Sequence, residues 1–550
     1  DGLYSMDVYL RNVKHADSVL LMIQDVAGKN IGRTLTFPIT HNEDHMTIKH
    51  TFKNPKLWSA ETPNVYRALV CLQKGDEIIH SVKEMFGFRT IEVRRGEGIF
   101  LNGQRIKIKG VNRHSFWPET GRTLSKHLNI EDVKLIKEMN MNAVRMSHYP
   151  PDVNFLDACD SLGLYVLDEL AGWQDAYSTE VGEKLVREMV TRDVNHPCII
   201  FWDNGNEGGN NHELDDDFDL YDPQKRIVLH PWAPRNGVNT THYQTFEMFQ
   251  QLADGPDVLM PTEIWHGLYG GGHAAGLEDY WHLLYDKPLS AGFFLWVFFD
   301  EGVVRTDQNG NIDTDGNHAP DGIVGPYREK EGSFFALKEI LSPVHISLKK
   351  IDTNFDGTIP VENRFDFINL NQCSFQYWLA DFPLPGETET GHRVVKSAAI
   401  EAPNIAPHKS GNLRLKLLPG FRKHDALFLK AVDPFGREII TFSFPIKKAS
   451  DFVGRIVPTS ENKATGSEKG GLISVSAGRM KIQFDRTNGM LRSINYDDAD
   501  ISLKNGPRLT AGGARTSHVK HYQQGNDYVI EVKYVSGNFK YHTWTVMGNG

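Results

Sequence analysis

The chain has 550 residues, of which 40% are hydrophobic and 24% are charged, and it carries 60 Lys and Arg against 70 Asp and Glu. A chain of this length exceeds what one hydrophobic core supports, so we expect about three or four domains. The net charge of −10 argues against nucleic acid or an anionic membrane surface as the main partner, and the sequence has no run of about 18 apolar residues that would span a membrane.

Residues 1–95 alternate apolar and polar positions, for example over residues 4–10, 19–23 and 46–52. Such segments, separated by Gly, Asn and Pro turns, predict an antiparallel, immunoglobulin-like β-sandwich. We expect its last strands at residues 65–72 and 86–93. Nothing in this module predicts catalysis.

Strand-like runs alternate with helical patterns between residues 96 and 344. The expected strands are residues 106–111, 142–146, 164–168, 199–202, 227–230, 238–243, 258–260 and 292–296. Eight strands over about 250 residues are typical of a (β/α)8 TIM barrel. A doubly wound sheet would alternate in the same way, but no glycine-rich phosphate loop follows any of these strands. Residues 129–139 predict an amphipathic helix with Asn129 as its N-cap.

The pattern becomes sandwich-like again from residue 345 to residue 448, which predicts a second immunoglobulin-like module with strands that include residues 367–370 and 375–379. Residues 449–471 are expected to be a linker, and residues 472–550 the start of a further, incomplete β-rich domain. Because the chain starts without an initiator Met or a signal segment and ends within a strand-like pattern, we expect sequence to be missing at both ends. The localisation stays open, with a periplasmic or secreted protein favoured if the substrate derives from a polysaccharide.

Four cysteines, Cys71, Cys159, Cys198 and Cys373, are scattered and form no C-x-x-C pair, so they leave the redox compartment open. Cys159 and Cys198 lie in apolar surroundings, which favours packed thiols over metal ligands.

Two apolar runs each lead into a glutamate, residues 199–202 into Glu207 and residues 258–260 into Glu263. A carboxylate just past the C-terminal end of a buried parallel strand lies where α/β barrels place their chemistry. A single glutamate of this kind is usually an ordinary salt-bridge or helix-start residue. Two at one barrel rim, however, are what cleavage of a glycosidic bond requires. One would be a neutral acid and the other an ionised nucleophile, so we expect their environments to differ.

Further polar residues occur at the ends of the same expected strands. They are Arg145 and His148 at the end of the second strand, Asp168 and Glu169 at the end of the third, His242 and Tyr243 at the end of the sixth, and Trp296 in the eighth. A cation beside the nucleophile would hold it ionised, and a histidine there could hydrogen-bond sugar hydroxyls. His114 and His148 taken singly would be buried, satisfied histidines, and only their convergence on one rim makes them candidates.

The same reasoning assigns no metal ligand. No histidine or carboxylate set has the spacing of a zinc site, and His230 and His266 are isolated enough to be structural. Hydrolysis by paired carboxylates requires no cofactor, although a structural or activating cation is compatible with the sequence.

At these residues the sequence resembles glycoside hydrolase family 2, which contains β-galactosidases, β-glucuronidases and β-mannosidases. The matching stretches are residues 109–114, 142–150, 163–169, 195–197 and 205–208. The resemblance covers the barrel and both flanking sandwiches. It implies that Glu207 is the acid/base, that Asn206 contacts the sugar 2-hydroxyl, and that Glu263 is a nucleophile acting with net retention.

The resemblance also implies that Tyr243 steadies the nucleophile, that Trp296 lies under the sugar, and that Arg145 and His148 are substrate-side residues. We expect His114 and Asp168 in the same substrate site. Two features depart from the family: its jelly-roll domain does not precede the first sandwich here, and residues 261–266 differ from the nucleophile segment of the best-known β-galactosidases.

One segment bears on the choice of sugar. In β-glucuronidases of this family an Asn-x-Lys pair after the eighth strand binds the sugar carboxylate, and the matching place here ends at Asp321. An aspartate would repel a uronate, so a neutral sugar is favoured. Arg328 and Lys330 lie nearby in the sequence and could serve an anionic group such as a sulfate.

The sequence therefore predicts a retaining, exo-acting glycoside hydrolase, first of all a β-galactosidase that releases terminal β-galactose from oligosaccharides. The alternatives are a β-glucuronidase or β-mannosidase of the same family and, from another class, a non-catalytic carbohydrate-binding protein, which would not need both glutamates. The expected partner is a carbohydrate substrate, with no nucleic acid and no membrane, and the sequence is compatible with a homo-oligomer.

Overall fold

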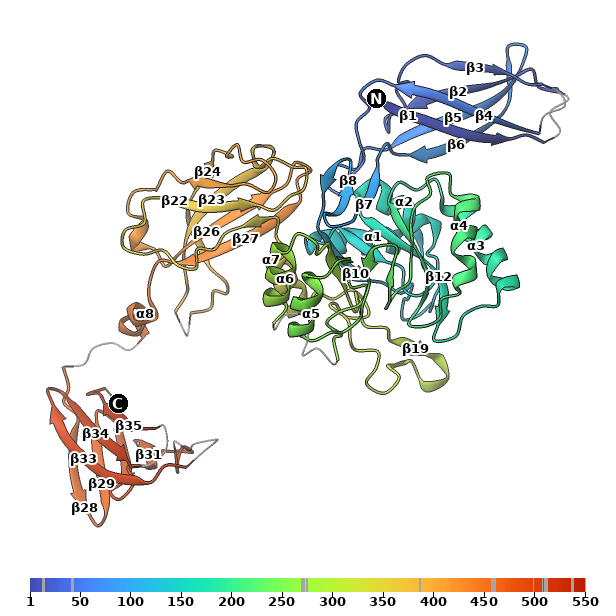
Figure 1. Cartoon of the computed structure of the whole chain (residues 1–550). Coiled ribbons are helices and arrows are strands. Elements are labelled where there is room, and N and C mark those ends of the chain that lie inside the picture. The colour runs from blue at the N-terminus through green and yellow to red at the C-terminus, as the bar shows by residue number, and fades with distance from the viewer. Residues whose placement is uncertain are drawn as a thin grey trace. The chain divides into compact units, whose positions relative to one another are not determined.

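The computed structural model describes residues 1–550 except 12–14, 41–43, 269–272, 274–275, 385–386, 457–460, 498, 507, 509–512, 536–538 and 550. The chain (Figure 1) divides into two compact units. The larger contains residues 1–380, 394–421 and 426–444, and the smaller contains the other residues up to 550. Within the described ranges, every helix is too short or too polar to traverse a lipid bilayer.

The first module of the larger unit consists of two antiparallel sheets. β1 (Gly2–Tyr9) pairs with β4 (His45–Phe52), and the second sheet has the order β3 (Leu35–Pro38), β2 (Ser18–Gln24), β5 (Tyr66–Lys74), β6 (Glu77–Phe86). Alternate side chains of β2, Val19, Leu21 and Ile23, are buried, as expected for a strand with one face on a core. β6 was not predicted because most of its side chains are exposed and its apolar residues do not alternate.

A small sheet of β7 (Ile91–Arg94), β8 (Gly98–Leu101) and β9 (Gln104–Arg105) follows. We expected residues 86–93 to end the first sandwich, but β7 pairs with β8 instead. Ile99 and Leu101 of β8 are fully buried in the same core as the barrel strands. The small sheet therefore belongs to the barrel rather than to the sandwich.

In the described part of residues 96–344, eight parallel strands form the barrel, one at each expected position. Six make a continuous sheet in the order β14 (Val228–Leu229), β13 (Ile199–Asn206), β12 (Tyr165–Trp173), β11 (Ala143–Arg145), β10 (Ile108–Asn112), β18 (Gly292–Leu295). β16 (Val238–Asn239) pairs in parallel with β17 (Val258–Leu259). Parallel bridges from Leu259 to Ser290 and from Ile264 to Leu295 connect this pair to β18. On the other side, Asn236 Nδ2 donates to Val228 O at 2.8 Å and Thr240 Oγ1 to His230 O at 2.8 Å.

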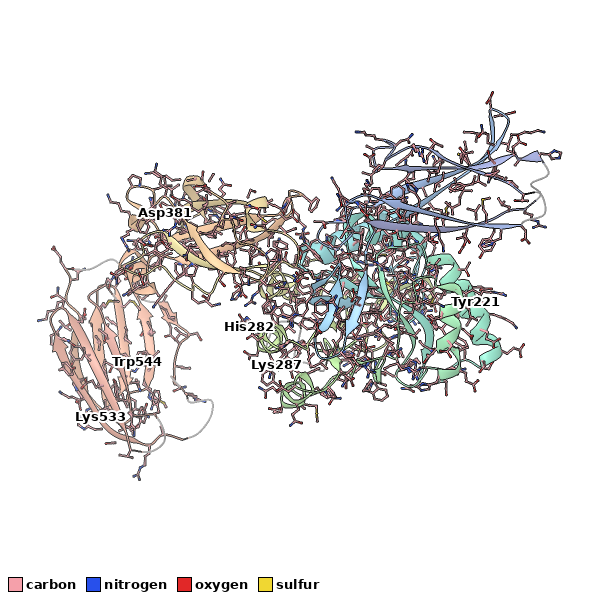
Figure 2. All side chains as sticks on the ribbon, turned by 45° about the horizontal axis from the view of Figure 1, so that its top comes forward. Tyr221, His282, Lys287, Asp381, Lys533 and Trp544 are labelled. Atoms are coloured by element: carbon pink, nitrogen blue, oxygen red, sulfur yellow. The ribbon has the colours of Figure 1, made fainter. Side chains whose placement is uncertain are left out.

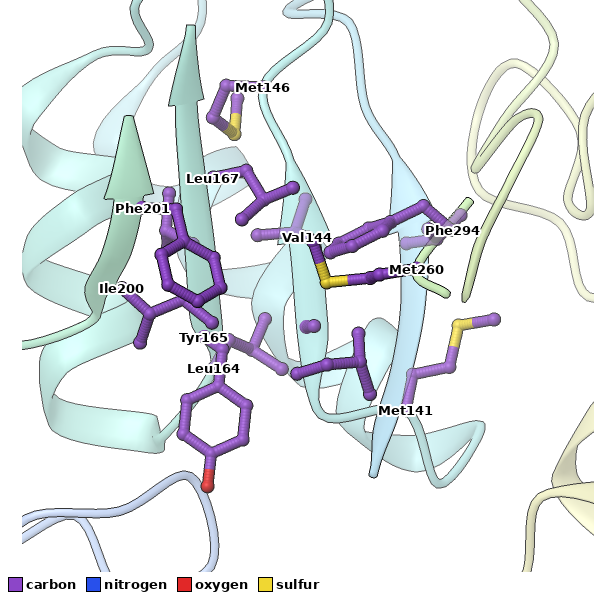
Figure 3. Packing of buried hydrophobic residues seen from close by; sticks show 14 of the residues in the cluster. Met141, Val144, Met146, Leu164, Tyr165, Leu167, Ile200, Phe201, Met260 and Phe294 are labelled. Atoms are coloured by element: carbon purple, nitrogen blue, oxygen red, sulfur yellow. The ribbon is translucent and has the colours of Figure 1, made fainter. Parts of the chain in front are cut away.

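Apolar side chains from these strands fill the barrel interior. Figure 3 shows Val144, Leu167, Met260 and Phe294 gathered between the strands, and all four are fully buried. β10 and β18 approach so closely that a Cβ on Gly292 (φ +114°) would lie 1.8 Å from the Ile108 carbonyl oxygen. Glycine at this position is therefore required by both the backbone conformation and the space.

Helices surround the barrel strands on the outside (Figure 1). In chain order they are α1 (Lys126–Glu138), α2 (Val153–Leu162), α3 (Thr179–Asp193), α4 (Asp215–Tyr221), α5 (Phe246–Ala253), α6 (Leu277–Asp286) and α7 (Gly332–Ile340). β14 is followed by the hairpin of β15 (Pro234–Arg235) and β16. A second hairpin, β19 (Val303–Arg305) and β20 (Asn311–Asp313), follows β18. Ser125, not Asn129, caps α1 by accepting a hydrogen bond from Leu128 N, and Asn129 is buried inside the helix.

The second sandwich-like module has two sheets. Their orders are β21 (Val344–His345), β22 (Thr358–Asn363), β25 (Ser410–Arg414) and β24 (Arg393–Ile400), β23 (Ser374–Asp381), β26 (Ala426–Val432), β27 (Glu438–Pro445). Residues 367–370, expected as a strand, form none. Instead the backbone N–H groups of Asp366, Phe367 and Ile368 donate to the carboxylate of Glu61 in the first module, at 2.7–3.0 Å.

The smaller unit contains α8 (Ala449–Ile456) and two antiparallel sheets: β28 (Thr465–Lys469), β29 (Leu472–Ala477), β30 (Met480–Asp485), β31 (Leu491–Tyr496), β32 (Ala499–Ile501), and β33 (Thr516–Gln524), β34 (Asp527–Tyr534), β35 (Tyr541–Val546). Figure 2 shows Trp544 among these strands, where it packs on their buried core.

The predicted linker 449–471 therefore contains a helix and a strand, and residues 457–460 of it lie outside the described residues. Its glycine pair, Gly470 and Gly471, has φ of +62° and +78° and forms the turn between β28 and β29. This glycine-rich polar segment is thus a hairpin. We predicted a linker because the turn and the exposed strand have the composition of one.

Candidate active site

A pocket of about 420 Å³ lies beside the C-terminal ends of the barrel strands. Six residues predicted from the sequence line it: His148, Asn206, Glu207, Tyr243, Glu263 and Trp296. Their positions follow from the topology, because the C-terminal ends of parallel strands meet at one end of a barrel.

Glu263 follows β17 and is only 4% exposed. Its Oε1 accepts a hydrogen bond from Arg145 Nη1 at 2.8 Å, and its Oε2 accepts one from the Tyr243 hydroxyl at 2.5 Å. Burial by itself would raise the pKa of Glu263, but His242, Arg145 and His148 lower that pKa to about 2. Glu263 is therefore a carboxylate at any physiological pH, as a nucleophile must be.

Glu207 follows β13, has a positive φ of +45°, and is more exposed than Glu263. Its Oε1 lies 2.9 Å from His242 Nδ1, and its Oε2 accepts from Trp173 Nε1 at 3.1 Å. The pKa of Glu207 is lowered, chiefly by the His242 hydrogen bond and against the opposing effect of burial. The two environments differ in exposure as expected, but the sequence led us to expect a neutral acid, not a lowered pKa.

One carboxylate oxygen of Glu207 and one of Glu263 lie within 4.8 Å of each other, with His242 between them. Retaining glycosidases need carboxyl groups about 5–5.5 Å apart, whereas inverting enzymes need about 6.5–9.5 Å to admit a water. The spacing here matches the retaining geometry.

Arg145 is completely buried and contacts several of the polar side chains of the site. It contacts three carboxylates, those of Glu169, Asp203 and Glu263, at 2.5–3.3 Å. It also donates to Asn206 Oδ1 at 2.8 Å, so the Asn206 amide N–H groups remain to donate to a sugar hydroxyl. These carboxylates raise the pKa of Arg145 against the effect of its burial, so its charge is permanent.

Trp296 follows β18, and two histidine rings pack against its indole. The His148 ring stacks on it at 5.3 Å and 11°, and the His114 ring meets it edge-on at 5.6 Å. Burial lowers the pKa of His114 well below its usual value, so that ring is neutral and can both donate and accept. Aromatic and imidazole groups in this arrangement suit the alternating apolar and hydroxyl surfaces of a sugar.

Asp168 does not lie with these residues. It is fully buried in β12, and burial together with the charge of Asp193 on α3 raises its pKa well above the usual range. Its neighbour Glu169 is the residue that reaches Arg145 and, at 3.0 Å, His148 Nδ1. Successive side chains of a strand point to opposite faces, so only one of the pair can enter the site. Asp168 is therefore corrected from a substrate-binding residue to a residue between the barrel and α3.

Comparison with known proteins agrees with this geometry. Residues 9–89 match glycosyl hydrolases family 2, and residues 91–228 match glycosyl hydrolases family 2, TIM barrel domain. A β-galactosidase of Lactococcus lactis is 28% identical over 488 residues, which cover 80% of this chain and 47% of that protein. A β-galactosidase of Pectobacterium atrosepticum is 30% identical over 305 residues, 49% of this chain and 29% of that protein. Residues 9–89 and 91–228 therefore match glycoside hydrolase family 2.

Solved structures share the fold of the chain. A Bifidobacterium dentium β-glucuronidase matches with a TM-score of 0.52 and 22% identity, over 62% of this chain and 63% of that one. A glycosyl hydrolase family 2 member from Bacteroides cellulosilyticus matches with a TM-score of 0.51 and 17% identity, over 99% of this chain and 77% of that one. The fold is thus a multidomain one that contains a TIM barrel. The chain spans less than half the length of the curated β-galactosidases that it matches.

Several residues in or beside the pocket were given no role from the sequence. Trp173 and His242 contact Glu207, and His266 and Glu301 line the pocket beside Asp321. His266 Nε2 lies 3.6 Å from Asp321 Oδ2, so His266 is a pocket residue and not an isolated structural one. His242 was noted at the end of the sixth strand, beside Tyr243, but the sequence did not indicate its contact with Glu207.

Three groups of side chains in the described residues have the proximity of metal ligands, although no zinc-like spacing occurs in the sequence. They are Asp160 with His196 and Cys198, His212 with Asp215 and His230, and Glu207 with His242 and Glu263. His230 therefore has ionisable neighbours: its Nε2 lies 2.8 Å from Asp215 Oδ1. Cys159 and Cys198 are buried thiols, and burial raises the pKa of both.

Replacing Tyr243 by Phe should slow turnover without weakening substrate binding. The phenol donates a 2.5 Å hydrogen bond to the Glu263 carboxylate, and a bond to a charged group contributes about 1.5–3 kcal/mol. We expect kcat to fall by about 10- to 100-fold with KM nearly unchanged. Steady-state kinetics of the Tyr243→Phe variant check this, and an unchanged kcat would contradict it.

Proposed function

We propose that the protein is a retaining, exo-acting β-galactosidase that removes terminal β-galactose from oligosaccharides. The observation that carries the proposal is the pair Glu207 and Glu263, whose carboxylate oxygens lie within 4.8 Å in one pocket. The curated relatives at 27–30% identity are β-galactosidases, which supports this sugar over others.

The proposed reaction has two steps. In the first, Glu263 attacks the anomeric carbon, the glycosidic C–O bond breaks, and Glu207 protonates the departing oxygen. In the second, Glu207 removes a proton from water, the water oxygen attacks the anomeric carbon, and the ester bond to Glu263 breaks. Each step inverts the anomeric centre, so the product retains the β configuration.

Two carboxyl groups on one side of the pocket support a neutral sugar. Burial raises the pKa of Asp321 to about 7, although its Oδ2 accepts from Trp296 Nε1 at 2.9 Å. Burial and the charge of Asp321 likewise raise the pKa of Glu301 to about 8. A uronate would be repelled whenever either carboxyl is ionised, and its own charge would raise both pKa values further, whereas a hydroxyl can donate to either carboxyl.

The two cations named from the sequence, Arg328 and Lys330, do not offset this acidity. Arg328 is buried, and its guanidinium donates hydrogen bonds to Asp132 at 2.7 Å and to the Phe116 carbonyl oxygen at 2.9 Å. Lys330 pairs with Glu138 at 2.5 Å. Neither residue lines the pocket, so our earlier suggestion that they hold an anionic group loses its support.

We further propose that the modules before and after the barrel in the sequence are immunoglobulin-like, and that residues 472–550 belong to a further β-rich domain. Their paired antiparallel sheets with alternating burial support this.

A panel of p-nitrophenyl glycosides tests the proposal. We expect turnover of the β-galactoside with first-formed β-galactose, observed by proton NMR before mutarotation. Preference for the β-glucuronide or β-mannoside would replace the sugar but keep the mechanism. Binding of galactosides without turnover of any glycoside would instead favour a non-catalytic carbohydrate-binding protein.

Replacing Asp321 by Asn should relax the exclusion of uronates. The amide can keep the acceptor for Trp296 Nε1 but carries no charge. We expect kcat/KM for the β-glucuronide to rise by about tenfold, because one repulsive interaction of roughly 1.4 kcal/mol is removed. Activity on the β-galactoside should fall modestly. Parallel kinetics on both substrates measure the ratio, and an unchanged ratio would show that Asp321 does not select the sugar.

A further inference from the structure

His242 contacts the proposed acid/base but has no role in the two steps above. Its side chain is fully buried. Its Nδ1 lies 2.9 Å from Glu207 Oε1 and 3.9 Å from Glu263 Oε2. A buried ionisable group between the two reacting carboxyls can influence where the catalytic proton resides.

The other ring nitrogen of His242 fixes which tautomer is present. Nε2 lies 2.8 Å from Thr262 Oγ1, and that hydroxyl donates to the Thr240 carbonyl oxygen at 3.2 Å. A hydroxyl has one proton, so Thr262 can only accept at its contact with the ring. Both threonines are fully buried, which keeps water from competing. His242 therefore carries a proton on Nε2.

This tautomer leaves one proton to be shared between His242 and Glu207. If the ring is neutral, Nδ1 is a bare acceptor and Glu207 must be the protonated donor. If the ring is cationic, its Nδ1–H donates to a Glu207 carboxylate. Both arrangements hold one transferable proton at the same 2.9 Å contact. Glu207, although its pKa is lowered, can thus still deliver a proton.

We propose that His242 is a positioning residue that stores the catalytic proton for Glu207, with Thr262 fixing its ring. The proposal rests on the glycosidase function proposed above. In the first step the proton passes to the departing oxygen, leaving a neutral His242 with Nε2–H and a Glu207 carboxylate. In the second step the proton taken from water restores the shared proton, so the pair returns to its starting state.

A leaving-group series separates proton storage from simple support. A 2,4-dinitrophenyl leaving group needs no protonation, whereas a sugar or alkyl leaving group does. Replacing His242 by Asn keeps an N–H donor near the Nδ1 position but removes the transferable proton. We expect kcat/KM for lactose or a methyl glycoside to fall by about 10²–10³-fold, within the range of general acid catalysis. The 2,4-dinitrophenyl glycoside should lose only about two- to fivefold, because its chemistry bypasses the acid.

Thr262 offers a matched pair in case the His242→Asn variant does not fold. Thr262→Val removes the acceptor for Nε2–H with little change in volume, and Thr262→Ser retains it. We expect Thr262→Val to show the same leaving-group dependence in weaker form, and Thr262→Ser to behave as wild type. Thermal unfolding of each variant controls for stability.

Two results would overturn the proposal. Equal losses on activated and unactivated substrates would make His242 a structural residue, and no loss on either would give it no role. A wild-type protein inactive on every glycoside would contradict the proposed function itself, so the two failures are distinguishable.

Discussion

Replacing Glu263 by Ala should abolish glycoside turnover, with a fall in kcat on the order of 10⁵-fold, because the variant has lost its nucleophile and not only a binding contact. Arg145 holds the Glu263 carboxylate ionised and the Tyr243 hydroxyl orients it. Alanine supplies neither this charge nor the attacking oxygen. Kinetics on an aryl galactoside measure the loss. Unaffected turnover would remove Glu263 from the mechanism.

Azide distinguishes the roles of the two glutamates. In Glu263→Ala, azide can enter the vacated space and attack directly, which gives an α-glycosyl azide. In Glu207→Ala, the covalent intermediate still forms from an activated substrate, and azide displaces Glu263 to give a β-glycosyl azide. If Glu263→Ala gave the β-azide and Glu207→Ala gave the α-azide, the assignment of nucleophile and acid/base would be reversed.

Replacing Arg145 by Met should destabilise the protein as well as inactivate it. The buried guanidinium compensates the carboxylates of Glu169, Asp203 and Glu263. Removing one partner of a buried ion pair costs about 3–5 kcal/mol, because it leaves uncompensated charge in a dry interior. Urea unfolding of this variant should show that loss. Arg187→Met, on the exposed face of α3, is the matched control and should stay within about 0.5 kcal/mol of wild type.

Glu263 makes the stability of the protein depend on pH. With Arg145 present, its folded-state pKa of about 2 lies below the value of 4.5 for a free carboxyl, so its ionisation stabilises the fold above pH 4.5. This contribution is lost as the pH falls from about 4.5 to about 2. Without Arg145 the pKa of Glu263 rises towards 4.5, so this contribution becomes smaller and the pH range over which it is lost becomes narrower. Unfolding curves across this range check the shift, and superimposable pH profiles would contradict it.

The sequence was sufficient for the parts of the site that depend on strand ends. Glu207, Glu263 and Arg145 each follow a short apolar run, and the ends of parallel strands converge whatever the loops do. Asp168 and Glu169 were harder to separate because the side-chain period is two, and a shift of one residue exchanges the faces. Composition does not reveal that register.

Backbone irregularity explains why His242 and Trp173 were given no role. His242 lies beyond the end of β16, beside Tyr243 with its positive φ of +51°, and both side chains contact the catalytic carboxyls. Trp173 ends β12 beyond a register shift against β13. Alternation rules assume regular strands, so they cannot place either side chain. The pKa values also depend on contacts between distant segments, such as His242 with Glu207, that no local pattern encodes.

The contact of Glu61 has a consequence for how the chain can be divided. This carboxylate comes from the first module, yet its ligands are three backbone N–H groups at the start of the second sandwich, and the Lys109 ammonium of the barrel is among the charges that act on it. Cutting away either flank would leave these donors or this acid exposed to solvent or unsatisfied. A fragment that keeps only one of the two flanking modules should therefore be less stable than a fragment that keeps both.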